Sequence, residues 1–209
     1  MPSDPHLSAR RVLRDAARGG ERSPAARLIV ASLLSGLVVF VWGFLFWNVL
    51  SPPSSTFQPA HDPAALSEAL IPYLPESGTY FVPETGTDPA AQRQAYAIGP
   101  IATIFLRRDG SDASAAVQLG LGYLSIALAC LAVALLLYRC ASALPGFGSR
   151  VGVVLLAGLA GSLLLDLGSP IWWYRPWHFH LLELVYAGVG WLLAGCVLAA
   201  LIKKGRLRF

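Results

Sequence analysis

The sequence predicts an all-α membrane protein, a four-helix transmembrane bundle that carries a small external α+β element. The chain is 55% hydrophobic and only 13% charged, whereas a soluble domain carries roughly a quarter of charged residues. Its mean hydropathy is +0.56. Uniform runs such as LGYLSIALACLAVALLLY lack the polar face that a surface helix of a soluble protein keeps. These three observations argue against a water-soluble helical bundle.

Four apolar stretches are about as long as the roughly 20 helical residues that cross a bilayer. They cover residues 27–50, 113–138, 151–169 and 178–202. The third has the weakest pattern, because Asp166 interrupts it and Pro170 follows it, so a three-span chain is the alternative. The first exceeds the about 7–15 apolar residues of a cleaved signal sequence and is expected to be retained as an anchor. Small residues four apart, as in Ser32 with Gly36, favour close helix packing.

Basic residues predict the orientation of these spans. Residues 1–26, 139–150 and 203–209, together with Arg27, hold 12 of the 16 lysines and arginines. By the positive-inside rule these segments are cytoplasmic, and so are both termini. We expect them to meet anionic lipid headgroups rather than nucleic acid. The excess of arginine over lysine, with abundant alanine and glycine, indicates a GC-rich bacterial genome and hence a bacterial inner membrane.

The external element lies in residues 51–112, and a second, aromatic external loop spans residues 170–177. Asp62 and Pro63 predict the capped start of a short helix that Pro72 ends. GTYFVP and IATIFLRR are typical of strands, which we expect to form a two-stranded hairpin. The interval ETGTDPAAQRQ between them is interpreted as turns. Because so small a unit buries little surface, it is expected to lie against the spans or a partner.

Aromatic side chains collect where the first span ends and the fourth begins. They are Trp42, Phe44, Phe46, Trp47, Trp172, Trp173, Tyr174 and Trp177. Amphipathic rings favour headgroup depth, so we interpret them as an interfacial belt. A platform for stacking a quinone or a sugar is the alternative.

Ionisable residues near the outer ends of the third and fourth spans form the candidate site. The residues are Asp166, Arg175, His178, His180 and Glu183. A carboxylate at membrane depth is costly unless it is paired or hydrated, so Glu183 is a functional candidate. His180 shares its helix face, whereas His178 points elsewhere because two helical residues turn about 200°. Three interpretations stay open: a structural polar knot in which Asp166 faces Arg175 or a histidine, a pocket for a ligand or a proton, and plain solvent exposure.

No cofactor, metal or catalytic constellation is predicted. The two histidines lie on opposite helix faces, and the three cysteines fall elsewhere, so neither a zinc site nor a haem site can be assembled. The chain has no GxSxG motif and no CxxC pair. We therefore expect a protein that is not an enzyme. A membrane enzyme acting on lipid or isoprenoid substrates is the weakest alternative, because no metal-binding acidic pair or acylation nucleophile is present.

Several short segments together resemble a family of small four-span bacterial inner-membrane proteins with no assigned activity. They are WNVLSP, GTYFVP, AIGPIATIF, the WW pair and GWLLAG. The resemblance implies the topology and transfers no catalytic residue. The sequence thus favours a non-enzymatic accessory or interaction subunit that contacts another membrane protein. The alternative is a small-molecule or proton-handling protein that uses the Asp166, Arg175, His180 and Glu183 cluster.

Overall fold

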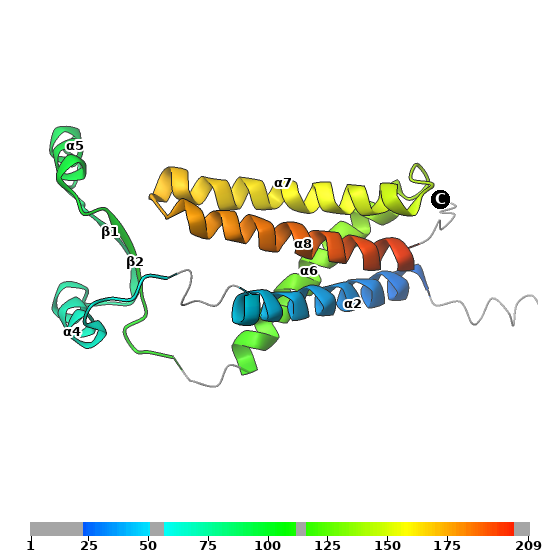
Figure 1. Cartoon of the computed structure of the whole chain (residues 1–209), viewed down its shortest axis with the longest axis horizontal. Helices are drawn as coiled ribbons and strands as arrows, with labels where there is room; N and C mark the ends of the chain where they lie inside the picture. Colours follow the sequence, from blue (N-terminus) through cyan, green and yellow to red (C-terminus); the bar gives the residue numbers. More distant parts are fainter. Residues whose placement is uncertain (1–22, 51–56, 112–115, 203–209) are drawn as a thin grey trace, which may run out of the picture. The chain divides into compact units, whose positions relative to one another are not determined.

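The computed structural model describes residues 23–50, 57–111 and 116–202, most of which are helical. Four long helices are labelled in Figure 1: α2 (Pro24–Leu45), α6 (Ala116–Cys140), α7 (Phe147–Trp173) and α8 (Trp177–Leu201). A short π-helix, η1 (Phe46–Leu50), continues α2. By length and composition each of the four helices could cross a membrane. The prediction of four long apolar helices, rather than three, is therefore confirmed for the described residues.

The third predicted span was too short. The helix α7 begins at Phe147, before the predicted start of the span at residue 151. It ends at Trp173, after the predicted end at Ser169, and contains Pro170. Pro170 lacks the N–H that would bond to the carbonyl of Asp166, but only three residues of α7 follow it. The side-chain hydroxyl of Ser169 also bonds to the carbonyl of Leu165 at 3.4 Å, within the turn before the proline. The predicted segments 1–26 and 203–209 lie outside the described residues, except for residues 23–26.

The external element contains two helices, so the prediction of one helix was wrong. The first, α4 (Pro63–Tyr73), begins as predicted: the carboxylate of Asp62 accepts hydrogen bonds from two backbone N–H groups at 3.0 and 3.1 Å. It runs one residue past Pro72. The second, α5 (Pro89–Ile98), lies in the interval interpreted as turns. Asp88 caps it by accepting from the Ala90 N–H at 2.8 Å. An Asp-Pro pair therefore starts both helices, and the glycine and threonine before Asp88 concealed the second one.

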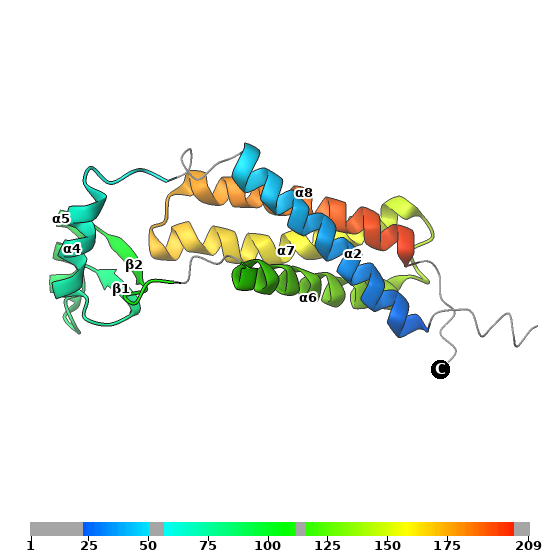
Figure 2. The same cartoon turned by 90° about the horizontal axis from the view of Figure 1, so that it is seen from below.

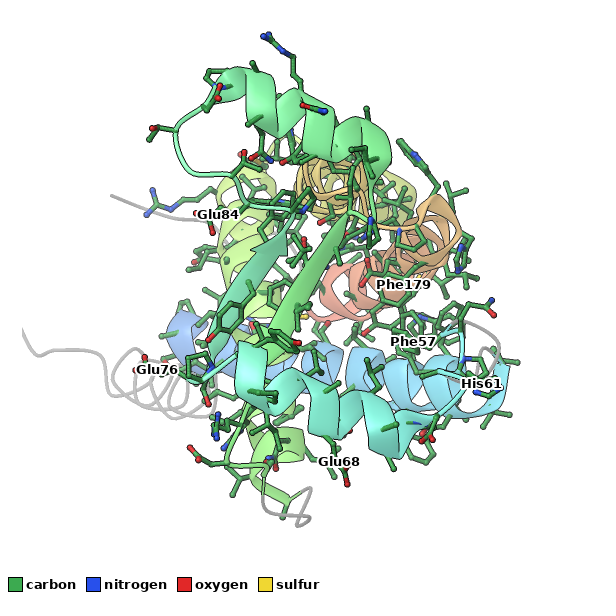
Figure 3. All side chains as sticks on the ribbon, turned by 90° about the vertical axis from the view of Figure 1, so that its left-hand side faces the viewer. Phe57, His61, Glu68, Glu76, Glu84 and Phe179 are labelled. Carbon is green, nitrogen blue, oxygen red and sulfur yellow. The ribbon has the colours of Figure 1, made fainter. Side chains whose placement is uncertain are left out.

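Two strands complete the external element. β1 (Gly78–Val82) pairs antiparallel with β2 (Ala102–Leu106), and Tyr80 lies opposite Ile104. The predicted strand pairing is confirmed, but α5 lies in the connection, so the strands do not form a tight hairpin. Figure 3 shows α5 and α4 at opposite ends of the strand pair. The guanidinium of Arg108, just after β2, donates to the carbonyls of Ile71, Leu74 and Pro75 at 2.9–3.4 Å and so holds the end of α4.

Contacts divide the chain into two compact units, and each long helix contributes to both. The helical unit comprises Met1–Phe40, Tyr123–Ala157 and Trp191–Phe209. The mixed unit comprises Val41–Gly122 and Gly158–Gly190, and so includes the whole described external element.

The helical unit has a core of aliphatic and small residues drawn from all four helices. Its buried members are Leu28, Ala31, Ala134, Leu137, Val154, Leu198 and Ile202. The start of α2 (blue) and the end of α8 (red) accordingly lie near one another in both Figure 1 and Figure 2. A Cβ atom placed on Gly36 would lie 3.0 Å from the Cα of Ala127, so α2 and α6 approach closely there. The buried hydroxyl of Ser35 donates to the carbonyl of Ala194 at 3.2 Å and joins α2 to α8. This is the small-residue packing typical of membrane helices.

Candidate functional site

The five predicted site residues all belong to the mixed unit. Asp166 lies on α7, Arg175 lies in the turn before α8, and the remaining three occupy the first two turns of α8. The two histidines differ as the helix geometry predicts: His178 is exposed, whereas His180 is buried.

His180 and Glu183 are in direct contact. The imidazole Nδ1 lies 2.7 Å from the carboxylate Oε2, and the two side chains are 1% and 29% exposed. The distance is short, but the angle at Nδ1 does not fit a hydrogen bond from the ring N–H to this carboxylate. The second ring nitrogen, Nε2, has no hydrogen-bond partner among the described residues. A small rotation of either side chain would align Nδ1 with the carboxylate for a hydrogen bond. A buried polar group without a partner costs about 1–3 kcal/mol and demands an explanation.

Two further charges act on Glu183. Arg175 attracts its carboxylate electrostatically, as His180 does when it is protonated, whereas Asp166 repels it. Asp166 also interacts electrostatically with His180. The structure thus brings together four of the five predicted residues, with Asp166 approaching from α7 and Arg175 from the turn. Among the residues described, the only ion pair in direct contact is that of His180 with Glu183.

Arg175 also contacts the external element. Its guanidinium carbon lies 5.1 Å from the centre of the Phe105 ring, which belongs to β2. At this distance a guanidinium is attracted to the negative face of the ring. Arg175 therefore lies between the charged cluster and the strand pair, within the same unit.

The aromatic turn between α7 and α8 contacts the external element as well. Trp173 lies edge-on to Phe81 of β1 with ring centres 6.3 Å apart, and Tyr174 lies edge-on to Tyr96 of α5 at 6.1 Å. All four rings of this segment, Trp172, Trp173, Tyr174 and Trp177, are nevertheless more than half exposed. The interpretation of these residues as part of a headgroup belt stays a prediction, and the contacts of Trp173 and Tyr174 with the external element were not predicted.

A second aromatic cluster packs beside His180. It joins the end of α2 and η1 to α8: the indole N–H of Trp42 donates to the carbonyl of Tyr186 at 3.0 Å, and the buried Phe46 ring lies 5.6 Å from the Tyr186 ring. Trp47 and Phe57 both contact Phe179, the residue before His180. Figure 3 shows Phe57 and Phe179 next to one another.

Sequence reasoning did not select Phe179 or Tyr186, although their spacing of seven residues places both on one face of α8. It also gave no signal for the π-helix η1. Segments of this kind are rare and often lie at functional sites.

The donor set does not favour a metal ion. Among the described residues, no three histidine, cysteine, aspartate or glutamate side chains are grouped closely enough to hold one. The cysteines Cys130, Cys140 and Cys196 are free thiols. The arrangement brings together two carboxylates, one imidazole and one guanidinium, a set suited to exchanging protons or to binding a small polar ligand.

Comparisons of the chain with protein-family models, curated proteins and solved structures found no match in any of the three. The resemblance to the four-span family therefore stays a prediction.

Proposed function

We propose that the chain is a multi-pass protein of the bacterial inner membrane, with both termini in the cytoplasm and the external element in the periplasm. Four apolar helices and the location of the basic residues support this orientation. Many leucines on these helices, including Leu156 and Leu164, are largely exposed. Lipid tails would cover them, whereas in water they would form large apolar patches. The basic flanks would contact anionic lipid headgroups.

Within the membrane, the chain would serve as a non-enzymatic accessory subunit that binds another membrane protein through the external element. One observation carries this proposal: neither α4 nor α5 contains a buried residue. Tyr73 and Ile98, at the ends of these helices, are 81% and 77% exposed. Because the element buries so little of its own apolar surface, a partner that covers it would add the burial that the chain lacks.

Site-specific photo-crosslinking in cells tests this proposal. A photoreactive amino acid at Ile98 is expected to give a discrete crosslinked band that contains a second protein. The same probe at Leu164, an exposed leucine of α7, is expected to give none. If neither position crosslinks to protein and the chain always purifies alone in mild detergent, the accessory role is wrong.

A second candidate function is favoured by the buried imidazole of His180, whose Nδ1 contacts Glu183 and whose Nε2 has no hydrogen-bond partner among the described residues. In this view the chain handles protons or a small polar ligand through the Asp166, Arg175, His180 and Glu183 cluster. Strains that carry Glu183→Gln or His180→Ala are expected to lose growth or transport at normal protein levels. Glu68→Gln, an exposed carboxylate of α4, is the matched control. Wild-type behaviour of both site variants would remove this candidate.

A further inference from the structure

The cluster around Glu183 combines burial with an uneven balance of charge. With a neutral imidazole, the two carboxylates and the guanidinium of Arg175 sum to one negative charge. The two carboxylates repel each other, and a net charge in a partly desolvated site is costly. One added positive charge would bring the cluster to neutrality.

We infer that the His180–Glu183 pair is a proton-binding site, in which Glu183 takes up one proton and His180 is the positioning residue. This inference deepens the second candidate function and rests on it. The proton comes from a hydronium ion of the adjacent aqueous phase, adds to a carboxylate oxygen of Glu183 and leaves one water molecule. The charge of the cluster changes from minus one to zero.

The exposure of the two side chains selects which of them receives the proton. His180 is 1% exposed, and its Nε2 has no acceptor among the described residues. A second proton on the imidazole would therefore create a buried cation with an unpartnered N–H, which is costly. Glu183 is 29% exposed, so its carboxyl group reaches the surface of the chain in the second turn of α8. We therefore place the entry and exit of the proton at Glu183.

The other groups that face the pair are consistent with a proton as the ligand. From α7 the pair faces the carboxylate of Asp166, and from the turn it faces the guanidinium of Arg175. The end of α2 and η1 contribute aromatic rings next to Phe179. A metal ion would need more donors than the two side chains in contact. An anion would be repelled by two carboxylates, whereas a proton needs only one of them.

Infrared difference spectroscopy of the full chain in lipid nanodiscs tests the site. Lowering the pH is expected to produce the carbonyl band of a partly buried protonated carboxyl group. Glu183→Gln should abolish this band, whereas Glu68→Gln on α4 should leave it unchanged. Loss of the band in Asp166→Asn with its retention in Glu183→Gln would overturn the assignment. A spectrum in which no band depends on Glu183, from a protein that keeps its helical content, would overturn the site itself.

The positioning role of His180 has its own measurement. His180→Asn is expected to keep the Glu183 band but to move its midpoint by about one pH unit or more, because a hydrogen bond to one protonation state is lost. His61→Asn, which replaces an exposed histidine of the external element, should leave the midpoint in place. An unchanged midpoint in His180→Asn would show that His180 does not position the carboxyl group. If the band behaves as expected while the Glu183→Gln strain grows and transports normally, the proton site stands and the candidate function fails.

Discussion

The helical unit and the mixed unit divide the chemistry of the chain between them. In the described part of the helical unit there is no aspartate or glutamate, and the charged residues are Arg27, Arg139 and Arg150. All described carboxylates and histidines fall in the mixed unit. The helices pack through small residues in the helical unit and through aromatic rings in the mixed unit. The same four helices thus form an apolar core over one part of their length and hold polar groups over the other.

The largest effect is expected in the core of the helical unit. Leu137→Ala removes a fully buried side chain of α6, and the cavity it leaves should cost about 2–5 kcal/mol of unfolding free energy. Leu156→Ala is the matched control, because this leucine of α7 is largely exposed. Both are measured by unfolding in mixed detergent micelles. Equal losses from the two variants would mean that the helical unit has no specific core.

Close approach of α2 and α6 is tested by adding volume. Gly36→Leu places a side chain where even a Cβ would lie 3.0 Å from the Cα of Ala127, and such overpacking should cost about 1–3 kcal/mol. Gly152→Leu on α7 meets no atom within 4 Å of its Cβ and should be neutral or slightly stabilising. The same unfolding assay compares them. A tolerated Gly36→Leu would contradict the packing of these two helices.

In the mixed unit, Arg108→Met should loosen the external element without unfolding the helices. The change removes the guanidinium that bonds to three carbonyls at the end of α4, at a cost of about 1 kcal/mol. Hydrogen exchange of the α4 amides is expected to accelerate several-fold. Arg107→Met, the neighbouring residue, serves as control and should change nothing. Uniform exchange in all three proteins would exclude a role of Arg108 in holding α4.

The most local effect is expected at the cap of α5. Asp88→Ala removes the carboxylate that accepts from the Ala90 N–H, which should cost about 0.5–2 kcal/mol. Only the exchange of α5 amides should change. Glu84→Ala, an exposed carboxylate in the same connection, provides the comparison. If it loosens α5 equally, the effect is one of charge and not of capping.

Much of the fold could be predicted from the sequence, because its helices and strands depend on local patterns. Long apolar runs predict α2, α6, α7 and α8. Runs of aromatic and β-branched residues bounded by glycine or proline predict both strands. The helix α5 was missed, although Asp88 and Pro89 repeat the signal of Asp62 and Pro63, because flanking turn residues outweighed it. Pro170 was given too much weight, because it lies inside α7 and three further residues of the helix follow it.

The candidate site was predictable in composition but not in arrangement. Helix periodicity placed His180 and Glu183 on one face, and the structure brings them to 2.7 Å. The contact of Arg175 with Phe105 joins positions 70 residues apart, and no local pattern encodes such a contact. The same holds for the rings of Phe81 and Tyr96, which meet the turn after α7.

Both proposed functions require that the mixed unit reach the periplasm while the basic loop before α7 stays in the cytoplasm. Cysteine labelling in whole cells tests this most directly. In a chain whose three cysteines are replaced by serine, Ser67→Cys reports on α4 and Ser149→Cys on the start of α7. The two are well matched, because each is an exposed serine whose hydroxyl donates to a nearby backbone carbonyl at 2.9 Å. A membrane-impermeant maleimide should label Ser67→Cys in intact cells and Ser149→Cys only after permeabilisation. Labelling of Ser149→Cys in intact cells, or protection of Ser67→Cys, would contradict the account.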